Sequence, residues 1–326
     1  MNQTKTPIKA AIKTRLLTAA EFQRLAEVPP EAEWFRNIRS PATKRAYENA
    51  IKDFMTFTGI KRPAEFRDVT RAHVIAWRDD LGDRLGDRTL IGASIRHRLA
   101  ALSSLFQYLC DKNTVTHNPV KGVKRPKVES DVGKTPAIAD HQARKLLVAP
   151  AEKSLKGIRD RAILATLLYH ALRREELCKL TVRDFKHERS GVAHLKVSGK
   201  GEKTRYVPLH GVAHDLISEY LNKAGHGADN AGALFRPFRN SRKGGNRKKA
   251  ITPDGVYKLV KKYSALLGFE IGAHALRATA ATNALDHKAD IAKVQEWLGH
   301  ANIATTRIYD HRKTRPEDSP TFKISY

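Results

Sequence analysis

The segment 297–309 reads WLGHANIATTRIY and says more about this protein than any other part of the chain. Apolar residues recur at helical spacing over 291–298, so we expect a helix there. Gly299 directly follows that helix, and glycine commonly ends helices. We therefore expect His300 to be held at a helix end, with Tyr309 nine residues further on.

A second motif lies upstream, where His274 and Arg277 are three residues apart in a predicted helix over 274–285. This spacing places both side chains on one helix face. The guanidinium fork of arginine can bind two phosphate oxygens and keeps its charge. Taken alone, such a pair is more often an ordinary surface pair than a binding site.

A β-hairpin is predicted further upstream. Apolar residues alternate at Ala193, Leu195 and Val197, a Gly-Lys-Gly turn centred on Lys200 follows, and a second strand covers 205–209. A lysine in such a turn is ordinarily solvated. Because the register of a hairpin cannot be fixed from sequence, Lys203 is an alternative to Lys200 for any role of a hairpin lysine.

Residues 158–172 are apolar on most faces and predict a buried helix. Arg173 follows directly after this helix. Glu176 lies three residues later and could orient the guanidinium of Arg173. If the two side chains formed only an exposed ion pair, that pair would contribute a few tenths of a kcal/mol to the stability of the fold.

The first part of the chain predicts a small helical domain. Ser40 and Pro41 have the chemistry of a helix N-cap and first helical residue, and apolar stripes follow after Thr70 and over 95–109. The next segment has the proline, glycine and lysine content of a linker. The expected boundaries are a basic arm over 1–33, the helical domain over 34–122, the linker over 123–136, a second domain over 137–312 and a tail over 313–326.

The composition points to a polyanionic partner. The chain has 326 residues and 60 lysines and arginines against 34 acids, a formal net charge of +26. This balance is typical of nucleic-acid binding, and a packaging protein without chemistry would share it. Residues 236–249 contain seven basic residues and no acid, so they form either a DNA-contacting loop or a solvated surface run.

Several classes of protein are excluded. The longest nearly apolar run has eight residues, whereas a membrane span needs about 20. Two cysteines are too few for a disulfide scaffold and fit a reducing cytosol, so we expect a cytoplasmic, nucleoid-associated protein. Clustered carboxylates, paired cysteine motifs and a nucleotide-binding glycine loop are absent from the sequence. Phosphodiester chemistry here would have to use side chains for charge stabilisation, attack and leaving-group protonation.

The order of these motifs resembles the tyrosine recombinase (phage integrase) family, including its Xer-like members. The similarity covers about residues 40–312. ALRREEL over 171–177 resembles the Gly-Leu-Arg-x-x-Glu-Leu motif of that family, and GKGEKTRYVPL over 199–209 resembles its lysine hairpin. The segment 297–309 is similar to its most diagnostic stretch. Ala171 replaces the usual glycine, and only seventeen residues follow Tyr309, which is short for a terminal exchange helix.

The resemblance implies a mainly α-helical protein with a small antiparallel β-sheet, built as a two-domain C-shaped DNA clamp with a helical core-binding domain and an α+β catalytic domain. It implies a site-specific DNA recombinase that acts through a 3′-phosphotyrosyl intermediate and a Holliday junction, with neither metal nor ATP. The residues that would carry this reaction are Arg173, Lys200, His274, Arg277, His300 and Tyr309, with Glu176 in support.

The implied partners are double-stranded DNA with specific recombination sites, three further protomers in a tetramer and accessory directionality proteins. Candidate DNA-binding residues are Lys44, Arg96, Arg242, Lys243 and Arg247. Residues 321–326 alternate like a short strand and are expected to add to the sheet of a neighbour, unless they are a frayed end. The alternatives are a DNA-binding protein without strand exchange and a relaxase resembling type IB topoisomerases.

Overall fold

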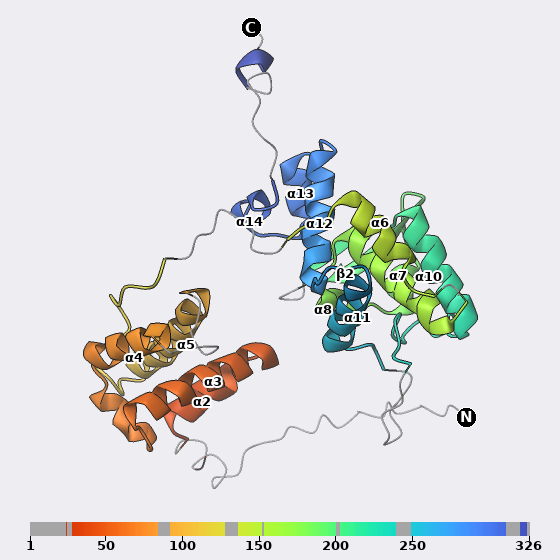
Figure 1. The fold of residues 1–326 in the computed structure, drawn as a ribbon. Coiled ribbons are helices and arrows are strands. Elements are labelled where there is room, and N and C mark those ends of the chain that lie inside the picture. The colour runs from red at the N-terminus through yellow and green to blue at the C-terminus, as the bar shows by residue number, and fades with distance from the viewer. Residues whose placement is uncertain are drawn as a thin grey trace, which may run out of the picture. The chain divides into compact units, whose positions relative to one another are not determined.

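A computed structural model describes residues 24, 28–83, 92–127, 136–151, 153–199, 203–238, 249–310 and 320–324. The chain divides into two compact units, Met1–Glu129 and Ser130–Tyr326. Figure 1 shows the helices and strands of the two units. Each unit has a hydrophobic core of its own. The division lies within 123–136, the segment with linker composition.

The described part of the first unit is helical. Its elements are α2 (Pro30–Asn37), α3 (Pro41–Thr58), the 3-10 helix η1 (Pro63–Asp68), α4 (Arg71–Asp83) and α5 (Gly92–Asp111). The predicted start of α3 is confirmed, because the hydroxyl of Ser40 accepts a hydrogen bond from the backbone N–H of Thr43 at 3.3 Å. The predicted apolar stripe of α5 packs into the core, where Trp77 and Phe54 meet edge to face.

The second unit combines helices with one small sheet, so the expected fold class is confirmed. Its helices and strands are α6 (Asp140–Val148), α7 (Leu155–His170), α8 (Arg174–Lys179), α9 (Val182–Phe185), β1 (His187–Arg189), β2 (Val192–Ser198), β3 (Thr204–Pro208), α10 (Gly211–Ala224), α11 (Pro253–Leu266), α12 (Ala273–Asp286), α13 (Ile291–Leu298), α14 (Ala304–Arg307) and the 3-10 helix η5 (Pro320–Lys323).

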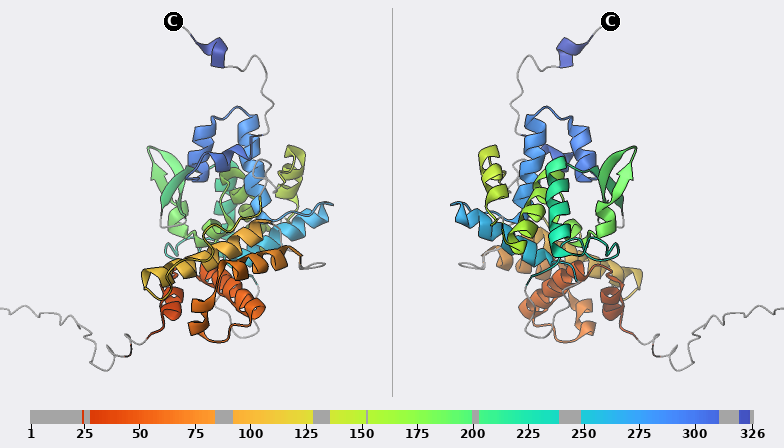
Figure 2. Two further views of the ribbon diagram at one scale, coloured as in Figure 1. Left: turned by 90° about the vertical axis from the view of Figure 1, so that its left-hand side faces the viewer. Right: turned by 90° about the vertical axis from the view of Figure 1, so that its right-hand side faces the viewer.

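The sheet is antiparallel with the strand order β1-β2-β3. The predicted hairpin is confirmed, since Ser198 pairs with Thr204 and Leu195 with Val207. Figure 2 shows the two strands side by side at the edge of the unit. The three-residue strand β1 was not predicted.

Helix α7 is the buried centre of the second unit, as its apolar sequence predicts. Twelve of its residues are buried, and α10 and α12 pack against it. It ends at Ala171, which has the left-handed conformation with φ of 49°. Alanine in this conformation is strained by roughly 1–2 kcal/mol. The predicted end of α13 is also confirmed, because Gly299 is left-handed with φ of 68°.

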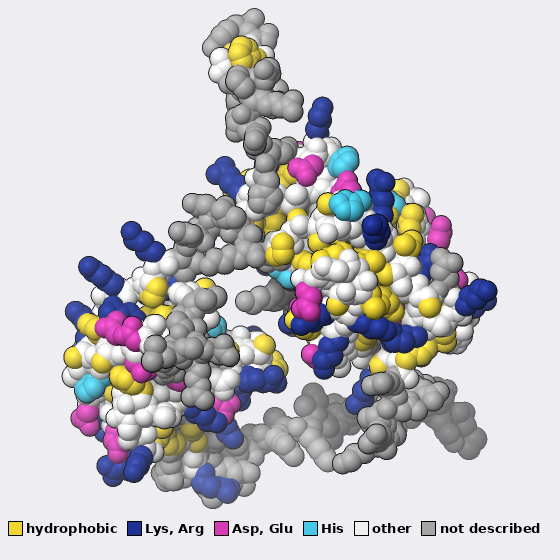
Figure 3. All heavy atoms as spheres, in the orientation of Figure 1, with side chains coloured by type: hydrophobic (Ala, Val, Ile, Leu, Met, Phe, Trp, Pro, Cys, Tyr) yellow, Lys and Arg dark blue, Asp and Glu magenta, His cyan; other side chains and the backbone are white. Residues whose placement is uncertain are grey.

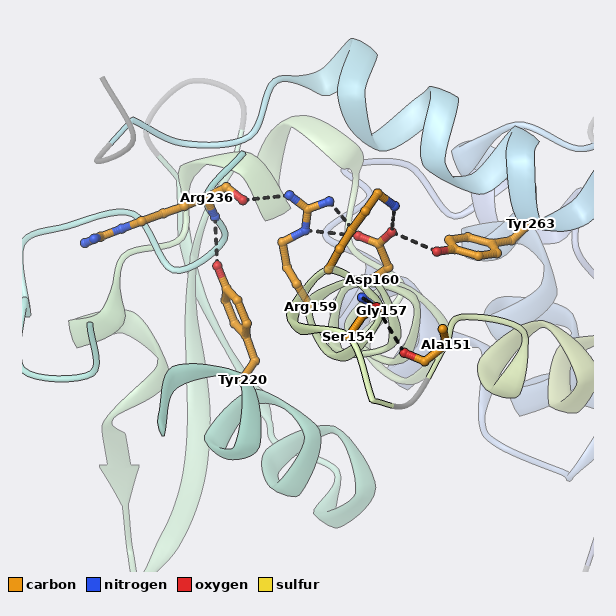
Figure 4. Close-up of polar contacts among 9 residues, drawn as sticks. Ala151, Ser154, Gly157, Arg159, Asp160, Tyr220, Arg236 and Tyr263 are labelled. Atoms are coloured by element: carbon orange, nitrogen blue, oxygen red, sulfur yellow. Dashed lines mark hydrogen bonds and ion pairs between the residues drawn. The ribbon is translucent and has the colours of Figure 1, made fainter. Parts of the chain in front are cut away.

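A buried ion-pair network fixes the start of α7 (Figure 4). The carboxylate of Asp160, fully buried, accepts hydrogen bonds from Lys156, from Arg159 Nη2 at 2.6 Å and from the Tyr263 hydroxyl at 2.9 Å. Arg159 also donates to the backbone carbonyl of Arg236 at 2.8 Å. This network therefore joins α7 to α11 and to the segment that follows α10.

In the single chain the described residues of the tail contain the 3-10 helix η5 and no strand, and addition of 321–326 to the sheet of a neighbour stays a prediction. A strand needs a neighbouring strand to satisfy its backbone groups, whereas a 3-10 turn satisfies them locally. Phe322 and Ile324 are 74% and 60% exposed, so neither side chain is buried in the single chain.

Lysine and arginine side chains are spread over the visible surface of both units (Figure 3). No helix among the described residues is long and apolar enough to span a bilayer. Within the same residues no group of three His, Cys, Asp or Glu side chains could hold a metal ion.

Cys110 and Cys178 are free thiols. Burial and the charge of Asp111 raise the pKa of Cys110, and burial raises the pKa of Cys178 to about 12.

Candidate active site

Arg173 lies between α7 and α8, directly before the first residue of α8. Its backbone N–H donates to Glu176 Oε2 at 2.9 Å, and its Nη1 donates to Glu176 Oε1 at 2.8 Å. The Arg173 side chain remains 35% exposed, whereas that of Glu176 is only 4% exposed. Glu176 therefore orients Arg173 towards the surface of the unit, as the spacing of the two residues suggests.

Arg205 on β3 is a further member of this cluster that the sequence analysis missed. Its Nη1 and Nη2 donate to the two oxygens of Glu176 at 2.9 and 2.8 Å. One signal was available, because strand alternation places Arg205 on the same face as the buried Val207. Burial alone would raise the pKa of Glu176, but hydrogen bonds and charge from Arg205, and then from Arg173, lower it to about 2.

Arg277 on α12 is almost completely buried, with 1% of its surface exposed. It donates to the carbonyl of Ala171 at 2.5 Å and to that of Leu298 at 2.6 Å. Burial and the nearby charge of Arg173 lower its pKa to about 10. Its Nε is buried without a hydrogen-bond partner among the described residues.

His300 follows the end of α13 and contacts Arg277. Arg277 Nη2 lies 2.9 Å from His300 Nε2, and since a guanidinium can only donate, Nε2 is the acceptor. The proton is therefore on Nδ1, which donates to the Thr306 hydroxyl at 3.0 Å. Burial and the positive charges of Arg277 and Arg173 lower the pKa of His300 to about 4, so the ring is neutral near pH 7.

Tyr309 lies close to His300, as the nine-residue spacing predicts. The two rings are stacked with their centroids 6.2 Å apart. Tyr309 is 4% exposed, and its backbone N–H donates to the carbonyl of Thr306, the residue whose hydroxyl holds His300. The short helix α14 thus places both rings.

His274 is on α12, three residues before Arg277, and is exposed. Together with Arg173 and Tyr257 it lines a cavity of about 340 Å³. Partial removal from water and the charges of Arg277 and Arg173 lower the pKa of His274. The structure therefore gathers Arg173, Glu176, His274, Arg277, His300 and Tyr309 in one region of the second unit.

The other candidate residues fall into two groups. Lys200, Arg242, Lys243 and Arg247 lie outside the described residues. Lys203 is exposed, directly before β3.

In the first unit, Lys44 Nζ lies 4.6 Å from the centre of the Phe35 ring, and Arg96 is exposed with its Nη1 donating to the carbonyl of Pro126 at 3.4 Å. Both of these cations therefore have a contact inside their own unit.

The cluster has a large excess of positive charge. Among the described residues, three guanidiniums interact with the carboxylate of Glu176, those of Arg173, Arg205 and Arg277, and Arg174 and Glu175 add one charge of each sign to the cavity lining. Burying like charges together is costly unless a counter-charge is supplied. A region with this balance is suited to bind an anion with several oxygen acceptors, such as a phosphodiester.

Both units match known families. Residues 137–315 match the phage integrase family, and residues 34–113 match the N-terminal SAM-like domain of phage integrases. The first match lies in the second unit and contains every described residue of the cluster. The second match lies in the helical first unit.

The chain is also similar to individual recombinases. It is 32% identical over 285 residues to a tyrosine recombinase of Pseudothermotoga lettingae, covering 86% of this chain and 91% of the relative. It is 36% identical over 286 residues to the tyrosine recombinase XerC of Pelobacter propionicus, covering 85% of this chain and 86% of the relative.

Solved structures share the fold. The XerH site-specific recombinase bound to its palindromic difH substrate superimposes with a TM-score of 0.62 at 22% identity, covering 83% of this chain and 76% of the other. A lambda integrase dimer bound to a COC′ core site gives a TM-score of 0.62 at 18% identity, covering 90% of this chain and 96% of the other.

Proposed function

This chain belongs to the phage integrase family of tyrosine recombinases, and from that premise we propose that it cleaves and rejoins DNA at specific sites through a 3′-phosphotyrosyl intermediate. The observation that carries the proposal is the cluster around Arg277. Its buried Nε lacks a partner among the described residues, and His300 and Tyr309 are stacked beside it. A phosphate oxygen would satisfy this buried donor.

In the first step, the Tyr309 hydroxyl oxygen attacks the scissile phosphorus while its proton passes to His274. Arg173 and Arg277 bind the non-bridging oxygens and stabilise the extra negative charge of the transition state. The bond from phosphorus to the 5′-oxygen breaks, and Lys200 protonates that oxygen. Lys203 is the alternative acid. Each acid–base role is worth about 10²–10⁴-fold in rate.

His300 has to change its hydrogen bonding in this step. In the free chain its Nε2 accepts from Arg277, so it cannot donate to DNA. A phosphate near the ring would favour the protonated form, in which Nε2 becomes a donor. We propose that DNA binding raises the pKa of His300 and turns Nε2 towards the scissile phosphate.

In the second step, a 5′-hydroxyl from the partner DNA attacks the phosphotyrosine, and the bond to Tyr309 breaks as the tyrosine regains a proton. Exchange of one strand pair gives a Holliday junction. We propose that four protomers assemble on two sites for this purpose, with the tail of each contacting a neighbour, and that accessory proteins control the direction. Integration, excision or resolution of a mobile element would use the same chemistry.

We propose 34–122 as the core-binding domain and 137–312 as the catalytic domain of a clamp around duplex DNA in the cytoplasm. With a net charge of +26, most contacts would be to phosphates. The logarithm of the affinity should then fall with the logarithm of salt concentration, by about 0.9 per phosphate neutralised. Lys44, Arg96, Arg242, Lys243 and Arg247 are the proposed contacts.

A nicked suicide substrate made from the DNA that flanks the gene tests the proposal. The wild-type chain should form a covalent protein–DNA adduct, and Tyr309→Phe should form none. Tyr206→Phe is the matched control, because Tyr206 is exposed on β3. Absence of a wild-type adduct on every flanking duplex would contradict recombinase chemistry, and relaxation of single duplexes without paired sites would favour a topoisomerase.

The general acid can be identified separately. Replacing the leaving 5′-oxygen by sulfur removes the need for a proton, because a thiolate leaves unprotonated. The sulfur substrate should therefore restore cleavage by Lys200→Ala. If it restores Lys203→Ala instead, the assignment of Lys200 is wrong.

A further inference from the structure

The carboxylate of Glu176 has all of its hydrogen-bonding capacity in use. Oε1 accepts from Arg173 Nη1 and Arg205 Nη1, and Oε2 accepts from the Arg173 backbone N–H and Arg205 Nη2, all at 2.8 to 2.9 Å. A carboxylate offers about four such positions. Arg205 thus donates two of the four hydrogen bonds that hold the Glu176 carboxylate, and this carboxylate in turn orients Arg173.

Arg205 also packs against two glycines at the ends of other elements. A Cβ atom added at Gly299 would lie 3.4 Å from Cδ and Nη1 of Arg205. One added at Gly199 would lie 3.7 Å from Arg205 Nη1 and 3.6 Å from Glu176 Oε1. Arg205 therefore lies between the end of β2, the start of α8 and the turn that leads from α13 to His300.

The charges give Arg205 a second effect. A buried carboxylate paired with one guanidinium forms a neutral pair, in which Glu176 would cancel most of the positive charge of Arg173. With two guanidiniums the group of three has a net positive charge, and the Arg205 side chain is only 16% exposed. Because charges interact more strongly away from water, Arg205 leaves Arg173 a larger effective charge for an anion.

We propose that Arg205 is a positioning residue for the recombination reaction: it holds Glu176, and through it the Arg173 guanidinium, beside the turn that carries His300, and it keeps Arg173 available to the scissile phosphate. This inference rests on the proposed function. Arg205 acts on Arg173 through the carboxylate of Glu176.

The first test is the rate of covalent adduct formation in a single turnover on the suicide substrate. Arg205→Met keeps much of the side-chain volume and removes the charge. Because a small misplacement of a reacting group can reduce a rate about 10²-fold, this variant should form the adduct about 10²-fold more slowly than the wild-type chain. Arg205→Lys keeps the charge but loses the two-pronged contact, so its loss should be smaller. The matched control is Arg189→Met, because Arg189 on β1 is exposed and its guanidinium lies 4.4 Å from the centre of the exposed Tyr206 ring. This variant should keep the wild-type rate.

The second test separates positioning of Arg173 from general damage. A methylphosphonate at the scissile position removes one negative charge and so reduces the need for an arginine. It should partly restore Arg173→Ala and Arg205→Met in parallel. Restoration of Arg205→Met by a 5′-sulfur leaving group but not by methylphosphonate would overturn the proposal, because Arg205 would then serve the general acid.

The third test is a double-mutant cycle. If Arg205 acts through Arg173, Arg173→Ala/Arg205→Met should be no slower than Arg173→Ala alone, whereas multiplied losses would show independent action and overturn the inference. Thermal unfolding checks that the variants are folded, and Arg205→Lys replaces Arg205→Met if the latter is not. A wild-type chain without an adduct contradicts the proposed function itself; a wild-type adduct with Arg205→Met equally fast contradicts only this inference.

Discussion

Asp160 and Glu176 are both buried carboxylates of the second unit, and each is surrounded by cations. Asp160 is bound by Arg159, Lys156 and the Tyr263 hydroxyl. Arg159 gives a further donor to a backbone carbonyl and is 5% exposed. The arginines differ in one respect, since the Arg159 side chain is 6% exposed and the Arg173 side chain is 35% exposed. At Asp160 the outward-facing cation is Lys156, with 49% of its side chain exposed.

The difference shows how one type of ion pair can serve two purposes. Around Asp160 the guanidinium of Arg159 and the hydroxyl of Tyr263 bond to buried groups of the chain, so these bonds hold α7, α11 and the segment that contains Arg236 together. Around Glu176 part of a guanidinium faces outward, so the ion pair prepares a group for an external anion. What distinguishes a structural pair from a functional one here is the accessibility of the arginine, not the pair itself.

The largest effect on stability should come from Asp160→Asn. This change leaves the buried guanidinium of Arg159 without a counter-charge, and breaking a buried ion pair from one side costs about 3–5 kcal/mol in the free energy of unfolding. Urea unfolding of the full chain measures this loss. If the urea midpoint moves by no more than that of an exposed variant such as Asp215→Asn, the network is not structural.

Compared with Asp160→Asn, Glu176→Gln should cause a smaller loss of stability and a larger loss of activity. Arg173 can still reach water, and the amide oxygen of glutamine can still accept a hydrogen bond from Arg205, whose side chain is 16% exposed. The cost in the free energy of unfolding should therefore be about 1–3 kcal/mol. Adduct formation should fall about 10²-fold because Arg173 loses its orientation. A variant as unstable as Asp160→Asn, with normal activity for its folded fraction, would remove the distinction between the two sites.

A smaller and more local change tests the contact between Arg205 and the turn before His300. Gly299 and Gly225 are both left-handed helix ends, with φ of 68° and 66°, but only Gly299 faces another side chain. Replacing either by alanine should cost roughly 1–2 kcal/mol in stability. Only Gly299→Ala should also slow adduct formation, and equal rates for the two variants would argue against this contact.

The smallest effect should be seen in the pH dependence of stability. The pKa of His300 falls from 6.5 to about 4 on folding, so between these values the unfolded chain binds a proton that the native chain does not, and stability decreases as the pH falls. The pKa of Glu176 falls from 4.5 to about 2, so its contribution is present above pH 4.5 and is lost as the pH falls towards 2.

Urea midpoints measured across both windows check this assignment. His300→Asn should reduce the dependence in the upper window without removing it, because burial also lowers the pKa of His170 to about 4. Glu176→Gln should reduce the dependence in the lower window only. An unchanged profile for both variants would mean that other groups cause the acid sensitivity.

Features set by local chemistry were predictable from the sequence. The start of α3 follows from Ser40 and Pro41, the end of α13 follows from Gly299, and the hairpin follows from alternation around a glycine-rich turn. The spacing of His300 and Tyr309 placed both near one helix end. In each case the interacting groups are close in the chain, so pattern and structure depend on the same few residues.

Features that depend on distant partners were not predictable. Arg205 meets Glu176 across 29 residues, and Arg277 meets the carbonyl of Ala171 across 106. No periodicity relates such positions. The tail is a related case, because an alternating segment forms a strand only where a neighbouring strand is present, and the single chain forms η5 there.

The raised pKa values of the two thiols have a practical consequence for redox chemistry. Thiolates, not thiols, are the forms that oxidants and alkylating reagents attack. Cys178, with a pKa of about 12, is almost entirely protonated near neutral pH, and the pKa of Cys110 is raised as well. A cysteine introduced at an exposed position should therefore react with a maleimide dye first, which allows a single fluorophore to be attached to the otherwise natural chain.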